Sequence, residues 1–356
     1  MVNFNPDKDI PDLSGKGLSY ASDQLIDARL VPSLFISMYF RATIRKESQA
    51  KFILITGANI GLGRESLHQL AKHNPKALYL TARNRSKAEA TMQEINASLP
   101  PESHSAIKFL ECDLTSFDSI KKAAKQFTSE QDRLDVLLNN AGIMACPEGT
   151  TKEGYEIQFG TNHVGHALLT KLLLPTLQKT AKTPGVEPGS VRVVNLSSAA
   201  EAFAPKPEGT KFDHLKDASS GGIGTWARYG QSKLANIHHA RALAARYPEL
   251  TCVSVHPGGI NTNLTSGPIA SYGAWLTYPV KVFGWLFLKT VAQGALNQTW
   301  ATVAPLAKDG RDGVKSGTFY FPVGLTGKDS KLAKDETLTE KLWEWTEKEL
   351  AGQEID

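Results

Sequence analysis

A short apolar run followed by a glycine-rich turn sets the strongest limit on how this chain folds. Residues 51–56 read K-F-I-L-I-T, the composition of a strand buried on both faces. Gly57, Gly61 and Gly63 follow, and apolar residues then recur at helical spacing from residue 64. Strand, glycine turn and helix in this order are typical of a phosphate cradle, because glycine lets the backbone approach a pyrophosphate at a helix N-terminus. Taken alone, the spacing G-x-x-x-G-x-G fits an ordinary tight turn equally well.

Further runs of strand length alternate with helical stretches along the chain, at residues 77–81, 107–110, 134–138, 191–196 and 253–255. This alternation predicts an α/β fold: a single doubly wound Rossmann-type domain with a central parallel sheet and helices on both faces. We place this domain at residues 51–356, after an N-terminal extension at residues 1–50.

The loop after the second strand bears on the choice of cofactor. Many NAD-binding folds carry an acidic residue there, which binds the ribose 2′-hydroxyl. Residues 82–87 instead read A-R-N-R-S-K, with three cations and no carboxylate. Because a guanidinium suits a 2′-phosphate, Arg83 and Lys87 are candidate phosphate ligands, and the loop favours NADP(H) over NAD(H). The alternative is a solvated basic loop.

Tyr229 and Lys233 lie four residues apart in Y-G-Q-S-K, so a helix would place them on one face. An ammonium held beside a phenol favours the phenolate. We therefore expect the pKa of Tyr229 to fall from its usual value of about 10. A tyrosine in that condition can donate and accept a proton near neutral pH.

Six motifs follow the glycine turn in a fixed order: C-D-L at 112–114, N-N-A-G at 139–142, Asn162 in F-G-T-N-H-V-G-H, Ser198 after a strand, the Tyr229–Lys233 pair, and H-P-G-G-I-N-T at 256–262. In this order they resemble the short-chain dehydrogenase/reductase family, most closely its retinol-dehydrogenase-like members, over about residues 51–325. The spacing between Ser198 and Tyr229 is longer than in many members, and the prolines and glycines between them predict a loop beside the site.

The resemblance implies a role for each matching residue. Tyr229 would be the catalytic acid and base, and Lys233 would lower its pKa and hold the nicotinamide ribose. Ser198 would bind the substrate oxygen, and Asn162 would support a water-linked proton relay. The remaining matches would bind the cofactor: Gly57, Ile60, Gly61, Leu62, Gly63, Asp113, Leu114, Asn140, Ile260 and Thr262.

Plainer interpretations stand beside these roles. Ser198 could simply end a strand, and Asn140 belongs to a residue type common in turns. Asn162 could bond locally within a helix. His163 and His166, near Asn162, are interpreted as packing residues.

The favoured function is an NADP(H)-dependent oxidoreductase that interconverts a carbonyl and an alcohol on a hydrophobic small molecule, lipid-like or secondary-metabolic. The alternative is a catalytically silent nucleotide-binding sensor or scaffold of the same fold. A net charge of +4 argues against nucleic acid as a partner, and homo-oligomerisation stays open. No metal-ligand spacing occurs, so we expect no metal, and three cysteines without paired spacing fit a reducing, cytoplasmic location.

Two segments do not follow the family pattern. Residues 268–288 are apolar and rich in aromatics, so we expect a hydrophobic lid near residues 263–290; contact with a membrane surface is the less favoured alternative. Residues 17–51 separate the D-L-S-G-K of 12–16 from Phe52, and removing them would restore a continuous lead-in to the first strand. We interpret them as an insertion, such as translated intron sequence, against the alternative of a genuine N-terminal element.

Overall fold

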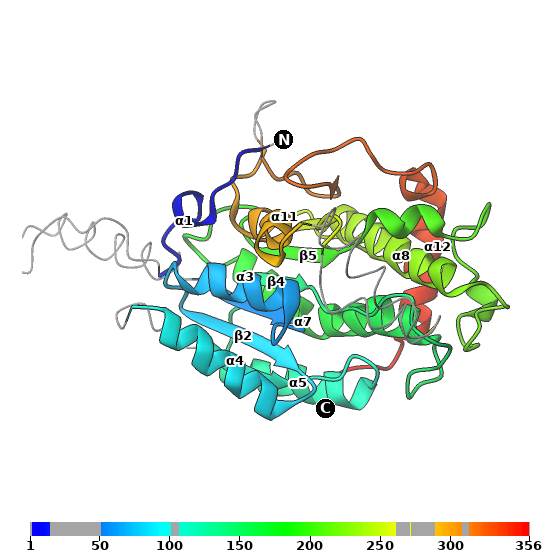
Figure 1. Cartoon of the computed structure of the whole chain (residues 1–356), viewed down its shortest axis with the longest axis horizontal. Coiled ribbons are helices and arrows are strands. Elements are labelled where there is room, and N and C mark those ends of the chain that lie inside the picture. Colours follow the sequence, from blue (N-terminus) through cyan, green and yellow to red (C-terminus); the bar gives the residue numbers. More distant parts are fainter. Residues whose placement is uncertain are drawn as a thin grey trace, which may run out of the picture.

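The structure is a computed structural model that describes residues 2–14, 51–100, 107–260, 271, 289–307 and 313–355. Its centre is a seven-stranded sheet in the order β3-β2-β1-β4-β5-β6-β7, in which every neighbouring pair is parallel (Figure 1). The strands are β1 (Phe52–Thr56), β2 (Ala77–Ala82), β3 (Ile107–Glu111), β4 (Val136–Asn139), β5 (Arg192–Leu196), β6 (Thr251–Val255) and β7 (Phe319–Tyr320). The predicted doubly wound parallel fold is confirmed.

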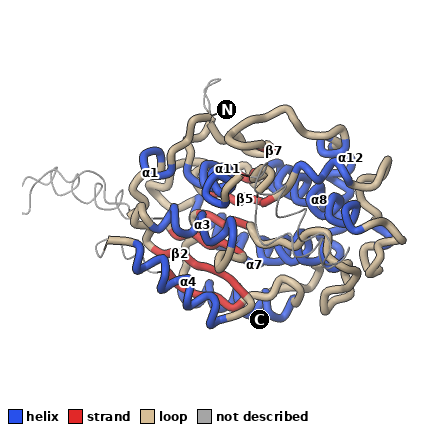
Figure 2. Tube along the Cα trace, in the orientation of Figure 1, coloured by secondary structure: helices blue, strands red, loops and turns tan. Residues whose placement is uncertain are grey.

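Helices cover both faces of the sheet (Figures 1 and 2). One face packs against α3 (Gly61–Ala71), α4 (Arg85–Ser98) and α11 (Val291–Val303). The other packs against α5 (Phe117–Glu130), α7 (Gly165–Ala181) and α8 (Thr225–Arg246), with α12 (Glu336–Glu349) beyond α8. In β1, Ile53 and Ile55 enter the first core and Leu54 the second, which explains the unbroken apolar run.

Short elements complete the described fold: α1 (Pro6–Asp9), α6 (Ile157–Phe159), a π-helical turn at Gly160–Val164, and 3₁₀ turns at Ala199–Phe203, Phe212–His214 and Leu332–Lys334. Within the described ranges, no helix combines the length and the apolar composition needed to cross a bilayer. Apart from Ser271, Lys289 and Thr290, the predicted lid at residues 263–290 lies outside the described residues.

The ends of the N-terminal segment meet at the start of β1. Residues 15–50 lie outside the described residues, but Leu13 and Lys51 on either side of them are hydrogen-bonded: the Lys51 N–H donates to the Leu13 carbonyl at 3.0 Å. Leu13 also donates to the His73 carbonyl, and the Lys51 ammonium lies 3.3 Å from Asp135. Leu13 and Lys51 are therefore held side by side at the start of β1.

We expect a chain that lacks residues 17–51 to fold. In that chain Lys16 would precede Phe52 and take the place of Lys51, an identical side chain. The observed bond from Lys51 to Leu13 would then become the first-to-fourth bond of a β-turn, with Gly15 at the third position, where type II turns prefer glycine. Because a shorter loop costs less closure entropy, the free energy of unfolding should rise by about 2 kcal/mol. Denaturant unfolding of the two proteins measures this difference.

A matched control removes residues 15–51 and so deletes the turn as well. This variant should be less stable than the chain that lacks only residues 17–51. If the chain that lacks only residues 17–51 fails to fold, residues 17–51 are a genuine structural element.

Candidate active site

A cavity of about 710 Å³ lies at the carboxyl ends of the strands. The strand order reverses between β1 and β4, and in open α/β sheets ligands bind in the crevice at such a reversal. Residues that follow six successive strands line the cavity: Gly57, Arg83, Asp113, Asn140, Ser198 and His256. The parallel sheet therefore brings motifs far apart in the sequence to one site.

The glycine turn forms one end of this cavity. The helix begins at Gly61, earlier than expected, so two of the three glycines lie in its first turn. A Cβ on Gly63 would lie 2.4 Å from Asn140 Nδ2 and 2.6 Å from the Gly57 oxygen, so no side chain fits there. Gly57 has a φ of +63°, which favours glycine. This packing fits a cradle that opens a helix rather than an isolated tight turn.

Asn140, which follows β4, is hydrogen-bonded to the end of β1, where the glycine turn begins. Its Nδ2 donates to the Thr56 carbonyl at 2.7 Å, and its Oδ1 accepts from Gln298 Nε2 at 3.0 Å. The residue lines the cavity, but its side chain is largely engaged in holding β1, β4 and α11 together.

The three cations of the basic loop after β2 have different surroundings. Arg83 lines the cavity. Arg85 instead lies over the Phe109 ring, 4.8 Å from its centroid, and 3.6 Å from Glu89. Lys87 is exposed in the first turn of α4 and does not line the cavity. Arg83 is therefore the strongest candidate of the three for a cofactor phosphate.

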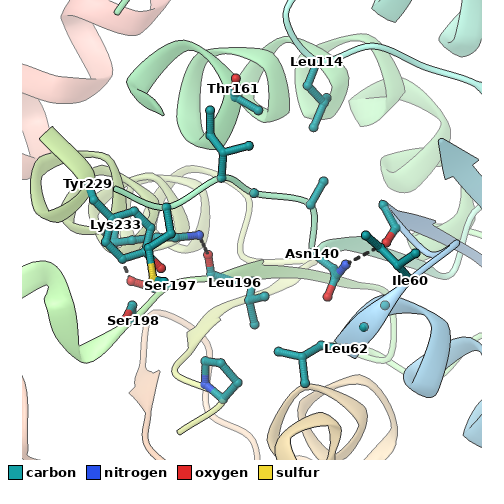
Figure 3. Close-up of a pocket in the computed structure, with 18 of the residues that line it drawn as sticks. Ile60, Leu62, Leu114, Asn140, Thr161, Leu196, Ser197, Ser198, Tyr229 and Lys233 are labelled. Atoms are coloured by element: carbon teal, nitrogen blue, oxygen red, sulfur yellow. Dashed lines mark hydrogen bonds between the residues drawn. The ribbon is translucent and has the colours of Figure 1, made fainter. Parts of the chain in front are cut away.

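Tyr229, Lys233 and Ser198 lie together at the other end of the cavity (Figure 3). Both α8 residues are buried on one face of the helix, and the Lys233 ammonium lies 5.7 Å from the Tyr229 ring centroid. The Ser198 side chain is close enough to Tyr229 to influence its pKa, and Ser198 Oγ accepts from the Ala200 N–H at 3.1 Å. The Lys233 ammonium donates to the Leu196 carbonyl at 2.9 Å.

The pKa of Tyr229 shifts in the direction opposite to the expected one. Burial raises it to about 12, and the nearby Ser198 side chain only partly opposes this. Burial also lowers the pKa of Lys233 to about 7. The spacing of the pair was interpreted correctly, but in the protein alone desolvation outweighs any effect of the ammonium on the phenol.

Asn162 lies behind the cavity wall, not on it. It sits in the π-helical turn and is fully buried. Its Oδ1 accepts from the Ile143 N–H, and its Nδ2 donates to the Ile143 carbonyl and to Ser232 Oγ, all at 2.9 Å. Because both N–H donors of this side chain are engaged and it does not line the cavity, any part that Asn162 plays in a relay falls to its main chain or to its positioning of Ile143.

The structure brings most of the predicted residues to this one cavity: Gly57, Ile60, Gly61, Leu62, Gly63, Arg83, Asp113, Leu114, Asn140, Ser198, Tyr229, Lys233 and Ile260. Thr262 lies outside the described residues. Sequence reasoning missed the apolar wall formed by Met144, Cys146, Ile157, Ala200 and Trp226. Trp226 precedes Tyr229 by three residues on a helix, a spacing that could have revealed it.

This arrangement defines a dinucleotide-binding α/β protein with a tyrosine–lysine pair at the far end of the cofactor crevice. The model of the short chain dehydrogenase family matches residues 51–211. The short-chain dehydrogenase/reductase drtF of Aspergillus calidoustus is 36% identical over 86% of this chain and 95% of that protein. Mouse retinol dehydrogenase 12 is 33% identical over 85% of this chain and 86% of its own length. The chain therefore belongs to the short-chain dehydrogenase/reductase family, and its relatives include the retinol dehydrogenases, as the sequence motifs predicted.

Solved structures agree on the fold. A crystal structure from Mycobacterium paratuberculosis matches with a TM-score of 0.59 and 28% identity, over 83% of this chain and 91% of the other. An NADPH-bound carbonyl reductase from chicken fatty liver matches with a TM-score of 0.53 and 22% identity, over 76% and 96% of the two chains.

Proposed function

We propose that this oxidoreductase uses NADP(H) to interconvert a carbonyl and an alcohol on a hydrophobic small molecule. The observation that carries the proposal is the Tyr229–Lys233 pair on α8, which shares a cavity with Ser198 and the glycine turn. A bound nicotinamide would supply or accept the hydride. The chain's own residues then have to bind the substrate oxygen and move a proton to or from it.

Tyr229 suits the proton transfer. In the reducing direction its hydroxyl would donate to the substrate oxygen while Ser198 Oγ holds that oxygen by a hydrogen bond. The Lys233 ammonium is fixed by the Leu196 carbonyl below the Tyr229 ring, where it would favour the phenolate left after the transfer. Asn162 would hold the Ile143 backbone beside the reacting groups.

The apolar wall supports a hydrophobic substrate. Met144, Cys146, Ile157 and Trp226 line the cavity with Tyr229. Trp226 packs edge-on against the Tyr229 ring, with 6.3 Å between ring centroids. A carbonyl or carbinol carbon that reaches Tyr229 would therefore bring its apolar body against this wall.

The position of Arg83 supports NADP(H). It lines the cavity beyond β2, and no acidic residue occupies residues 82–87 to bind a 2′-hydroxyl. A guanidinium there can bind a 2′-phosphate through two parallel hydrogen bonds.

Arg83→Asp should weaken the use of NADPH far more than that of NADH. The change removes a phosphate ligand, adds a repelling charge, and supplies a carboxylate that can accept from a 2′-hydroxyl. The ratio of kcat/KM for the two cofactors should move toward NADH by about tenfold or more, since a charge-assisted hydrogen bond contributes about 1.5–3 kcal/mol.

The exposed Lys122→Asp variant makes the same charge change on α5, and it should leave the ratio unchanged. An Arg83→Asp ratio equal to that of this control would place the phosphate site elsewhere and remove the main support for NADP(H).

The function itself is tested by a panel of apolar ketones, aldehydes and alcohols assayed with both cofactors. NADPH fluorescence on titration with protein first shows whether the cofactor binds. Turnover of an apolar carbonyl with NADPH is the expected result. Binding of NADPH without turnover of any compound would favour the silent nucleotide-binding alternative.

A further inference from the structure

The His166 side chain joins two parts of the site that the mechanism above leaves separate. It lies on α7 and is 2% exposed. Its Nε2 is 2.8 Å from Thr56 Oγ1, at the end of β1, and its Nδ1 is 3.0 Å from the Asn162 carbonyl oxygen. A packing role alone does not explain two polar contacts of this kind.

Donor and acceptor chemistry fixes the direction of both bonds. A carbonyl oxygen only accepts, so Nδ1 carries a proton. Thr56 Oγ1 already accepts from the Asn140 and Ala141 N–H groups, each at 2.9 Å, which fills its two lone pairs. Its hydroxyl must therefore donate to His166 Nε2. The imidazole is neutral and protonated at Nδ1.

The surroundings of the ring agree with this protonation state. Burial is the main cause that lowers the pKa of His166 to about 4, and the nearby Lys233 charge acts in the same direction. A second positive charge so close to the ammonium would be unfavourable.

The loop at residues 140–143, which follows β4, is held at both ends. Thr56 holds the Asn140 and Ala141 amides at one end, and Asn162 holds the Ile143 backbone at the other. Between them, a Cβ placed on Gly142 would lie 3.1 Å from Asn162 Oδ1 and 3.3 Å from Lys233 Nζ. The loop therefore passes directly against the site lysine, and its position sets the space at the middle of the cavity.

We propose that His166 is a positioning residue of this site: as a neutral imidazole it joins Thr56 to the Asn162 carbonyl and so fixes the loop 140–143 between the cofactor end and Lys233. The inference rests on the proposed function, because the loop matters only where cofactor and proton transfer meet. The His166 ring thus links Thr56, which holds the first part of the loop, to Asn162, which holds its last part.

Three variants of His166 separate the effect of its contact with Thr56 from that of its contact with the Asn162 carbonyl. His166→Asn keeps a donor near the Nδ1 position for the Asn162 carbonyl but loses Thr56. His166→Gln can present its amide oxygen to the Thr56 hydroxyl, and His166→Leu keeps bulk without either bond. We expect His166→Leu to weaken the dissociation constant for NADPH and to lower kcat/KM by about tenfold each, with partial recovery in at least one amide variant.

His163→Leu is the matched control. This neighbouring buried histidine bonds Thr346, with 3.0 Å between Nε2 and Oγ1, away from the cavity. Its loss should reduce stability without changing NADPH affinity measured well below the melting temperature. If His166→Leu behaves like His163→Leu, or keeps wild-type affinity and kcat/KM, the positioning role is wrong.

Imidazole ¹⁵N NMR of the wild-type protein tests the geometry without any variant. The expected signature is a neutral His166 protonated at Nδ1. A ring protonated at Nε2, or at both nitrogens, near neutral pH would overturn the inference and leave the proposed function standing. Conversely, a wild-type protein that turns over no substrate would overturn the proposed function. The NMR result for the His166 tautomer would still show whether its two hydrogen bonds are as described.

Discussion

Tyr229→Phe should abolish measurable turnover while cofactor binding stays close to that of the wild type. The phenyl ring keeps its edge contact with Trp226 and its place above Lys233, but it has no proton to give. Loss of general acid–base catalysis alone lowers a rate by about 10²–10⁴. Ser198 Oγ retains the Ala200 N–H as a partner, so the fold should tolerate the change.

Tyr247→Phe controls for the loss of a phenol. Tyr247 caps the far end of the same helix, and this variant should keep wild-type turnover. NADPH titration and steady-state rates on both proteins make the comparison. Wild-type-like turnover in a folded Tyr229→Phe protein would exclude Tyr229 as the proton donor.

Lys233→Met should lower activity and raise stability together. The variant loses the charge that favours the Tyr229 phenolate and a donor for the ribose, so kcat and cofactor affinity should both fall. The same ammonium is buried, and burial is the cause that lowers its pKa. A methionine fills similar space without that cost.

The stability gain depends on pH in a defined way. The pKa of Lys233 is about 7 in the folded protein and 10.5 when exposed. Between these pH values the lysine is therefore protonated in the unfolded chain and neutral in the folded protein. The cost of burying the lysine is thus complete at and below pH 7 and disappears as the pH rises toward 10.5. Near pH 7 the variant should gain about 2–4 kcal/mol, after allowance for the lost bond to Leu196.

Denaturant unfolding at pH 7 and pH 10 measures this window, with the exposed Lys125→Met as the matched control. The stability difference between Lys233→Met and the wild type should shrink at the higher pH, and the control should show no such change. An equal stability difference at pH 7 and pH 10 would show that burial of the Lys233 ammonium does not destabilise the folded protein.

The sequence predicted the sheet well because its strands are buried on both faces. Each run such as residues 51–56 must be apolar throughout, and this pattern is visible without knowledge of partners. β7 was missed because Phe319–Tyr320 is too short to form a pattern. The site residues, which the sequence showed only as separate motifs, meet in the structure because parallel strands place the residues after them at one edge.

Other features of the site depend on distant partners and could not be predicted. The direction of the Tyr229 pKa follows from burial, which the spacing of Tyr229 and Lys233 does not reveal. The relay role of Asn162 stays a prediction; the sequence did not reveal that its side chain bonds Ile143 and Ser232. His166 was interpreted as packing because its partner Thr56 lies 110 positions away.

The hydrogen bond between Leu13 and Lys51 also makes the N-terminal side of the sheet a natural place for protein engineering. Both residues lie at the amino end of β1, whereas the cavity lies beyond its carboxyl end, a five-residue strand away. A fluorescent reporter or an affinity domain grafted between residues 16 and 51 would therefore be carried on the side of the sheet remote from the chemistry. Such a fusion would let the protein be followed or immobilised with its substrate entrance free.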